Sequence, residues 1–438
     1  MLLSKTQEDI KNSILEFILD DNPKTSKFLR WNAIAGAGKT STLKEMYKDY
    51  KEINSINNSL NQYLKIRDKL FFTATTNPAA TLLNTIGCRN ISTIHKFLNL
   101  KVMRGNNGTQ YLYQVNQPKY SKDTIVIIDE ASMVCDVTYE AIINSPYHYI
   151  LIGDNQQFLA VNNNTEDVFK FYKEKELTST ETFRFEDPAL SSYVRVLKQN
   201  VMDRKIEYIP NKIGDSLWII DDDVYFNTLR DAYQYNSDDC LTITFSNKQV
   251  SKYETHIKNI LGQTHKVKTG DKLIFKSPIR QHMGYRIDPK GGKNLTEIEV
   301  IKQASSPIVG NLLDQANIDY LIVRSREKTH KIYRECYLVE DYQELSSVLR
   351  RYARKKSWNE YYDIKNNVTV PNYGYASTAH GSQGMTIPYV FLDLTDIAHM
   401  THLVGKDTIN RMIYVAISRA SKNVFVRGNI PQSLIGNY

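Results

Sequence analysis

The sequence FLRWNAIAGAGKTSTLKEMY, from Phe28 to Tyr47, decides the fold. An apolar approach runs into a loop with two glycines, and the loop runs into helix-forming sequence. This strand–loop–helix order is the setting in which a phosphate-binding loop works, because the glycines let the backbone approach a polyphosphate and the helix presents its positive end. The stretch therefore predicts a nucleotide site at a helix N-terminus.

Each polar residue of this loop has an expected task. Lys39 would reach the β- and γ-phosphate oxygens, and Thr40 would hold Mg²⁺ through its hydroxyl group. The usual pattern begins with glycine, whereas this chain has Ala33, a change of one methyl group. The residues expected to contact the nucleotide here are Ala35, Gly36, Ala37, Gly38, Lys39, Thr40 and Ser41.

Composition limits the class of protein. The chain has 438 residues, 41% hydrophobic and 24% charged, which suits a globular protein of about two to four domains. Its 4 cysteines form no CxxC pair, which argues against a disulfide framework or a zinc site and suits a reducing cytosol. No apolar run has transmembrane length, so we expect a cytoplasmic protein without a membrane partner. The net charge of +8 favours a polyanionic partner.

Two further apolar runs end in polar residues. TIVIIDEASMV places a β-branched run before Asp129 and Glu130, as expected for a strand buried on both faces of a parallel sheet. Asp129 would hold the metal through its water shell, and Glu130 would polarise the attacking water. YHYILIGDNQQF ends with Gln157, which could sense the γ-phosphate. Because such strand ends meet at one edge of an open sheet, we predict an α/β fold.

Other residues give signals that position alone leaves open. Gln7 could read adenine through its amide, or it could be an ordinary helix-surface glutamine. Arg184 lies in a loop before a helix, and Arg419 lies between a helix-like run and a strand. Position alone makes little case for Arg184, because arginine is usually a surface ion-pair partner, whereas Arg419 could reach across a cleft to a γ-phosphate. A lone histidine such as His95 is more often structural than functional.

Two segments have sequence patterns typical of β-strands separated by turns. Gly-Asn-Asn-Gly separates Val102 from the alternating YLYQV stretch, which predicts a β-hairpin within about 98–120. The alternation places Tyr111 and Tyr113 on one face and Leu112 on the other. From about 262 to 370, short β-like pieces separated by turn signals predict a small β-barrel insertion.

The order of motifs resembles that of superfamily 1 helicases, and most closely the 5′→3′ branch (superfamily 1B) typified by RecD and the small phage Dda helicase. Nine matches in family order run across nearly the whole chain, and together they are far more specific than any one of them. They are AIAGAGKT (33–40), TATTNPAAT (73–81), STIH (92–95), DEAS (129–132), GDNQQ (153–157), FR (183–184), FSNKQV (245–250), STAHGSQG (377–384) and YVAISRA (414–420).

The resemblance implies roles for particular residues. Gln7 would read adenine, Gln157 would sense the γ-phosphate, and Arg184 and Arg419 would act as arginine fingers. Gln383 and Gly384 would join the nucleotide site. The residues implied to bind DNA are Thr73, Thr75, Asn77, Pro78, His95, Tyr111, Tyr113, Asn247, Thr378 and His380. GDNQQFLAV lacks the prolines that often follow this motif, which leaves the DNA contacts of that motif open.

The resemblance also implies a domain plan. A first RecA-like domain would span 1–175, with a β-hairpin wedge at about 98–120. A second RecA-like domain would comprise 176–261 and 371–438, with an SH3-like barrel and a helical arm inserted at 262–370. One tyrosine of the hairpin could cap the last base pair at a fork; alternatively, both tyrosines pack on the neighbouring barrel and only brace the hairpin.

The implied activity is an ATP- and Mg²⁺-dependent DNA helicase that moves 5′→3′ on single-stranded DNA, in replication, recombination or repair. Its expected partners are single-stranded DNA, duplex forks and a single-strand-binding or replication protein. Its expected location is the cytoplasm, or the host cytoplasm if a phage encodes it. Two alternatives stay open: an RNA helicase or remodeller, and a nucleotide switch that does not unwind.

Overall fold

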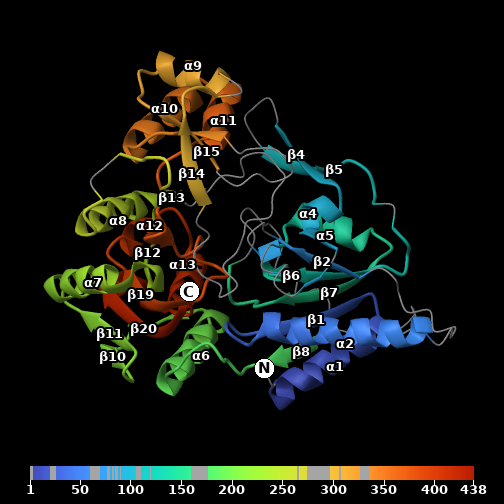
Figure 1. Ribbon diagram of the computed structural model, residues 1–438. Coiled ribbons are helices and arrows are strands. Elements are labelled where there is room, and N and C mark those ends of the chain that lie inside the picture. Colours follow the sequence, from blue (N-terminus) through green and yellow to red (C-terminus); the bar gives the residue numbers. More distant parts are fainter. Residues whose placement is uncertain are drawn as a thin grey trace.

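The computed structural model describes residues 3–19, 26–59, 70–75, 79–80, 83, 87–88, 90–104, 110–118, 120–158, 176–263, 266–273, 296–304, 307–325 and 335–438. Figure 1 shows two α/β halves side by side, with a smaller group of strands and helices above the second half. Each half is built on a six-stranded sheet.

The first sheet is wholly parallel and has the strand order β3-β2-β6-β7-β1-β8. Its strands are β1 (Phe28–Ala33), β2 (Leu70–Ala74), β3 (Ile91–Thr93), β6 (Ile125–Asp129), β7 (His148–Gly153) and β8 (Glu176–Ser179). The helices around it are α1 (Lys5–Leu19), α2 (Lys39–Ser59), α4 (Ile94–Phe97), the 3₁₀ turn η1 (Ala131–Met133) and α5 (Asp136–Ile143).

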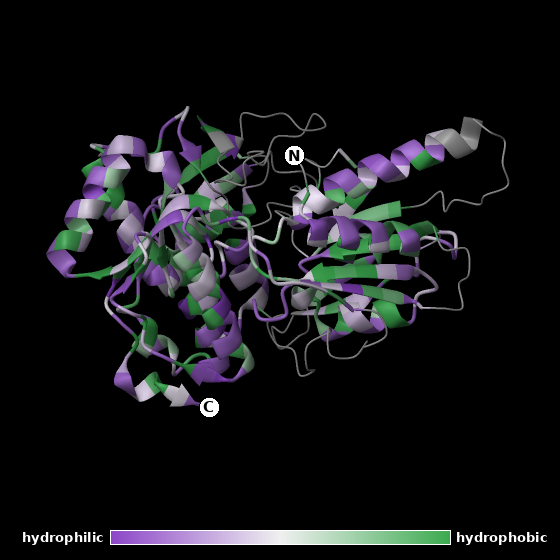
Figure 2. Cartoon of the chain, turned by 90° about the horizontal axis from the view of Figure 1, so that it is seen from below, coloured by the Kyte–Doolittle hydropathy of each residue, from purple (hydrophilic) through white to green (hydrophobic). Residues whose placement is uncertain are grey.

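Alternating residues of these strands supply two cores. Ile125 and Ile127 pack with α1 and α2 on one face, whereas Val126 and Ile128 pack with α4 and α5 on the other. This is the behaviour expected of a strand covered on both faces. In Figure 2 the strands of this sheet are mostly green, whereas α2 is mostly purple.

Strand β8 corrects the expected boundary at 175. It pairs in parallel with β1, from Arg30 opposite Glu176 to Ala33 opposite Ser179, so the first sheet continues to Ser179. Trp31 reinforces this pairing, because its indole N–H donates to Ser179 Oγ over 3.0 Å.

The second sheet has the order β10-β11-β20-β19-β12-β18 and is parallel except for the β10–β11 pair. Its strands are β10 (Lys212–Ile213), β11 (Leu217–Ile220), β12 (Cys240–Thr244), β18 (Ala376–Thr378), β19 (Ile387–Asp393) and β20 (Ala420–Arg427). The helical elements of this half are α6 (Pro188–Met202), α7 (Asp222–Asn236), η3 (Ser237–Asp239), α8 (Asn247–Ile260), α12 (Ile397–Met400), α13 (Lys406–Ile417) and η4 (Gln432–Leu434).

The helices of this half begin where the sequence supplies capping residues. Asp187 caps α6 by accepting a hydrogen bond from the Ala189 amide, and Pro188 occupies the first turn, where its missing N–H is harmless. Ser246 caps α8 in the same way, by accepting from the Gln249 amide. A short pair, β9 (Lys205–Ile206) with β21 (Gly436–Asn437), holds the end of the described chain beside α6.

A third sheet lies between β12 and β18 in the chain, inside the segment expected to be an insertion. Its order is β13-β14-β15-β16-β17, antiparallel except for the β16–β17 pair. Its elements are β13 (Lys272–Leu273), β14 (Thr296–Ile301), α9 (Ile308–Gln315), β15 (Leu321–Ser325), β16 (Glu335–Leu338), α10 (Tyr342–Arg354), α11 (Trp358–Asn367) and β17 (Val368–Thr369). The three helices gather at the top of Figure 1.

A separate two-stranded sheet lies within the segment expected to be a hairpin. β4 (Leu100–Arg104) pairs antiparallel with β5 (Gln110–Gln114), with Met103 opposite Tyr111 and Lys101 opposite Tyr113. Within the described ranges, no helix combines the length and the apolar content that a bilayer crossing needs.

The two halves share a packed boundary. Ala35 and Phe158 come from the first half of the chain, yet both are buried in the apolar cluster that α6 and α13 form with the second sheet. The carboxyl ends of the first sheet therefore face the second half directly.

Candidate nucleotide-binding site

The phosphate loop joins β1 to α2, as its sequence predicts. Gly36 and Gly38 have φ angles of 79° and 76°, which residues with side chains rarely adopt. A Cβ atom on Gly38 would lie 2.2 Å from Gln7 Nε2, and one on Gly36 would lie 2.6 Å from Arg184 Cβ. Both positions therefore require glycine, and the loop forms a close-walled backbone cradle at the start of a helix.

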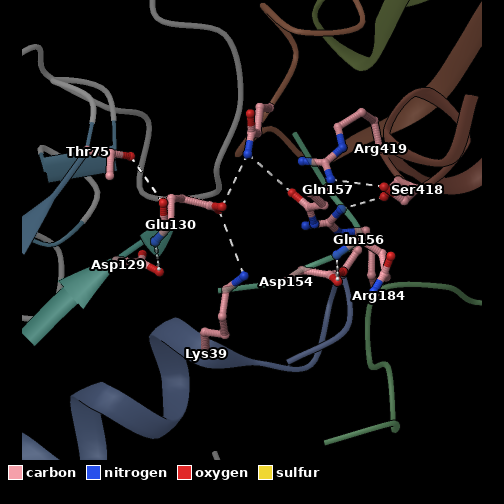
Figure 3. Close-up of polar contacts among 12 residues, drawn as sticks. Lys39, Thr75, Asp129, Glu130, Asp154, Gln156, Gln157, Arg184, Ser418 and Arg419 are labelled. Atoms are coloured by element: carbon pink, nitrogen blue, oxygen red, sulfur yellow. Dashed lines mark hydrogen bonds and ion pairs between the residues drawn. The ribbon is translucent and has the colours of Figure 1, made fainter. Parts of the chain in front are cut away.

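The polar residues of this loop meet the carboxylates at the end of β6. Lys39 Nζ lies 3.9 Å from Glu130 Oε1, and Figure 3 shows the two side chains pointing toward each other. Asp129 Oδ1 accepts a hydrogen bond from the Glu130 amide over 2.9 Å. Glu130 itself has a positive φ of 53°, and Thr75 Oγ1 donates to its carbonyl over 3.3 Å.

The electrostatics of this pair suit a cation. Burial raises the pKa of Asp129 to about 6, the charge of Glu130 adds to this effect, and Lys39 opposes it. Asp129 and Glu130 concentrate negative charge beside the loop, and carboxylate and hydroxyl oxygens are the ligands that Mg²⁺ prefers. Asp129 and the hydroxyl of Thr40, in the first turn of α2, therefore fit a magnesium site.

Gln383 connects this site to the second half. Its Nε2 atom lies 3.3 Å from Glu130 Oε2 and 3.4 Å from Gln157 Oε1. Its Oε1 atom is buried, and no hydrogen-bond partner is found for it among the described residues. One amide thus bridges the expected water-activating residue and the expected γ-phosphate sensor, with an acceptor left over. Gly384 follows with a φ of 81°.

Both expected arginine fingers lie at this boundary. The guanidinium of Arg184 donates to the carbonyl of Ser418, and Arg419 donates to Val415 O over 3.0 Å and to Ser418 Oγ over 2.9 Å (Figure 3). Burial and the charge of Arg419 lower the pKa of Arg184. Burial also lowers the pKa of Arg419, which is 1% exposed, while Glu130 opposes the shift. Two buried like charges side by side suit a site that receives an anion.

Gln7 lies against the loop. Its Nε2 atom donates to Ala37 O over 3.1 Å, and its Oε1 atom accepts from the Ser4 amide over 2.9 Å. One N–H and one acceptor direction of the amide remain for a base.

Phe183 is a site residue that sequence reasoning missed. Its amide donates to Gly36 O over 2.9 Å, and its ring would lie 3.7 Å from a Cβ on Gly38. The side chain is nonetheless 54% exposed, so a flat apolar ring stands open beside the phosphate loop. The signal in the sequence is its membership of the FR match (183–184), in which only Arg184 was expected to have a role.

The residues expected to bind DNA differ in how deeply they are buried. Thr73 differs from the expectation, because its side chain is fully buried and its hydroxyl donates to Ile127 O over 2.8 Å, which ties β2 to β6. His95 is half-buried in α4, and burial lowers its pKa. His380 packs its ring 4.9 Å from that of Phe158. Asn77 and Pro78 lie outside the described residues.

The other expected contacts are partly or fully exposed, as His380 is. Asn247 is the exposed first residue of α8, and the half-buried Thr378 accepts a hydrogen bond from the Gly381 amide over 3.0 Å. On the hairpin, Tyr111 is 48% exposed and Tyr113 is half-buried. A surface pocket of about 390 Å³ between α8 and the start of α10 contains none of these site residues.

Comparisons with known proteins agree with this geometry. The family model of the AAA domain matches residues 23–212. The ATP-dependent DNA helicase Dda of enterobacteria phage T4 is 22% identical over 398 residues, which cover 81% of this chain and 87% of the relative. An uncharacterized protein of Acanthamoeba polyphaga mimivirus is 21% identical over 510 residues, covering 97% and 99%.

A solved structure supports the fold. The Pif1 helicase from Bacteroides, in complex with ADP-AlF3 and ssDNA, superposes with a TM-score of 0.50 and 15% identity, covering 99% of this chain and 94% of that one. The resemblance expected from the motifs is confirmed: the chain is similar to superfamily 1B helicases of the Dda and Pif1 type, and its fold contains two RecA-like α/β domains.

Proposed function

We propose that this chain is an ATP-dependent DNA helicase that moves 5′→3′ along single-stranded DNA. The observation that carries the proposal is the contact of Gln383 with both Glu130 and Gln157. A residue of the second half thereby touches the two groups of the first half that should respond to the γ-phosphate. Similarity to Dda, a DNA helicase, supplies the substrate class.

The mechanism follows from the placement of the chain's own groups. Bound ATP and Mg²⁺ would supply the phosphoryl group and a compensating positive charge. The loop amides and Lys39 would hold the phosphates, and Asp129 with Thr40 would hold the metal. Glu130 orients and polarises the attacking water, since it lies beside Lys39 and ends the same strand as Asp129.

The second half contributes the remaining groups. Arg419 and Arg184 stabilise the charge that develops on the phosphoryl oxygens, and Gln383 relays the state of the site to the loop that follows β18. Because Thr378 ends β18 and His380 lies in that loop, hydrolysis moves one grip on DNA relative to the other. The open ring of Phe183 offers a stacking surface for the base, next to the amide of Gln7.

The further elements take the roles that the motif order suggests. The β4–β5 hairpin is the strand-separating wedge, and the sheet from β13 to β17 is the SH3-like barrel with α10 and α11 as its arm. The second RecA-like domain resumes after this insertion, at about residue 371. Thr75, His95, Asn247, Thr378 and His380 lie along the proposed path of single-stranded DNA, together with Asn77 and Pro78.

ATPase assays with and without single-stranded DNA test the proposal most directly. Strong stimulation by DNA, together with unwinding of a duplex that has a 5′ overhang but not a 3′ overhang, is the expected result. Greater stimulation by RNA would favour an RNA remodeller. A rate that neither nucleic acid changes would favour a nucleotide switch.

A further inference from the structure

Asp154 is a fully buried carboxylate that none of the expected catalytic roles uses. It follows β7, it is 0% exposed, and it belongs to the first half of the chain. Two of its partners come from the second half: Lys198 Nζ of α6 lies 3.0 Å from Oδ1, and the hydroxyl of Tyr414 in α13 donates to Oδ2. The Gln156 amide also donates to Oδ1, over 3.1 Å.

The surroundings keep this carboxylate charged. Burial alone would raise the pKa of Asp154, but Lys198, Tyr414 and Lys39 together hold it below its usual value. A hydrogen bond between a hydroxyl group and a buried anion is among the stronger polar contacts in a protein. The carboxylate is therefore a strong acceptor placed where the two halves meet.

Tyr414 links this carboxylate to the phosphate loop. The same hydroxyl that donates to Asp154 accepts a hydrogen bond from the Ala35 amide over 3.4 Å. Tyr414 is fully buried, and Arg419 lies five residues further along, two residues after the end of α13. A shift of α13 relative to the loop would therefore move the guanidinium of Arg419 as well.

A second contact from the same face of α13 sets the register. Arg411 donates to the carbonyl groups of Asn155 and Gln157, each over 2.8 Å, while its Nε is held by Asp407. Residues three apart lie on one face of a helix, so Arg411 and Tyr414 contact the segment after β7 side by side. One contact is to backbone and the other to a charged side chain.

We propose that Asp154 and Tyr414 form a positioning pair that seats α13 against the phosphate loop and so places Arg419 for catalysis. This proposal rests on the proposed function, and it assigns a role to two residues that had none. Neither touches the nucleotide in this account. Both act through the position of the helix.

Tyr414→Phe tests the pair with little risk to folding, because it removes one hydroxyl group and keeps the ring. Tyr438→Phe is the matched control, since the Tyr438 hydroxyl also contacts α13, through Asn410 and Asp407, but makes those contacts within the second half. We expect kcat of Tyr414→Phe to fall about ten- to a hundredfold, the range for a lost hydrogen bond to a charged group. KM for ATP and the affinity for ADP should stay near wild type, because the first half still binds the nucleotide.

A double variant gives a readout that general damage would not produce. If Tyr414 acts by placing Arg419, then Tyr414→Phe should change kcat much less in an Arg419→Lys background than in wild type. Asp154→Asn should resemble Tyr414→Phe, and the two together should be no worse than Asp154→Asn alone.

Two results would overturn the pair: a kcat for Tyr414→Phe equal to that of Tyr438→Phe, or a parallel loss of ADP binding, which would mean that Tyr414 only supports the loop. Failure of the helicase proposal looks different. In that case wild type itself shows no stimulation by DNA, and the comparison of basal kcat values still decides the pair.

Discussion

The side-chain nitrogen Nε2 of Gln383 lies 3.3 Å from Glu130 Oε2, although the two residues are 253 positions apart in sequence. The contact joins the carboxylate beside the phosphate loop to the loop that follows β18 in the other sheet. A change of charge or position at Glu130 therefore alters a direct contact with the second half. The roles assigned to the surrounding residues can be tested one at a time.

Lys39→Ala should reduce ATP hydrolysis to background. The change removes the cation that would face the β- and γ-phosphates, and it removes the positive charge of Lys39 from beside Glu130 and Asp129. Saturating ATP should not restore turnover, as a steady-state titration would show. Substantial residual turnover in the purified variant would contradict the phosphate-loop assignment.

Glu130→Gln should separate binding from chemistry. Glutamine keeps an oxygen that can accept from Gln383 but cannot polarise water as a carboxylate does, so kcat should fall about 10²- to 10⁴-fold. Equilibrium binding of ATP should stay close to wild type. If the variant bound ATP as poorly as Lys39→Ala, the division of roles between the two residues would be wrong.

Arg419→Lys should slow DNA-stimulated hydrolysis severely. Arginine fingers contribute roughly 10³-fold or more to turnover, and a lysine cannot reproduce the planar fork that contacts Val415 O and Ser418 Oγ. Arg195→Lys, at an exposed position on α6, is the matched control and should behave as wild type. Near-normal turnover in Arg419→Lys would show that the residue is structural.

Arg184→Lys should make hydrolysis sensitive to pH. Burial and the charge of Arg419 lower the pKa of the group at this position. The ordinary pKa of lysine is about 10.4, whereas that of arginine is above about 12. The cation is the active form, and a lowered pKa means that its proton is lost as pH rises. As the pH rises, ATPase activity of the variant should therefore fall at a lower pH than that of wild type. Parallel pH–rate profiles would contradict a buried cationic role.

Replacing Tyr111 and Tyr113 by alanine tests the hairpin. A ring that stacks on a base contributes about 1–3 kcal/mol, comparable to the stacking lost per separated base-pair step. Fork unwinding should therefore fall sharply while ATPase on single-stranded DNA stays near wild type. Tyr235→Ala, which changes a ring that is 91% exposed on α7, controls for loss of any surface aromatic. If unwinding survives, the wedge lies elsewhere; if both activities collapse, the tyrosines brace the fold.

Local patterns predicted the parts of the site that are local. The β-branched run to Ile128 and the glycines at 36 and 38 each describe their own backbone, so the strand and the loop follow from the sequence. Ala33 shows why its departure from the usual glycine is harmless. It is the last residue of β1, fully buried and paired with Ser179, and an extended strand does not need a positive φ.

The contacts between the halves could not be predicted in that way. Asp154 and Tyr414 are 260 residues apart. Each lies in a motif in which another residue has the expected catalytic role, Gln157 in the first motif and Arg419 in the second. A carboxylate becomes buried, and a hydroxyl becomes its donor, only when two sheets meet. The burial of Thr73 likewise depends on the neighbouring strand β6, which its own sequence context does not reveal.

The packing of Ala35 and Phe158 into the cluster of the second half has a calorimetric consequence. Separating the two halves would bring both side chains into water, and hydration of apolar surface raises the heat capacity. Each opening of the enzyme thus carries a positive heat-capacity change, and each closing a negative one. The free energy of opening must therefore vary with temperature along a curve, so the balance between open and closed forms depends on the temperature at which the enzyme works.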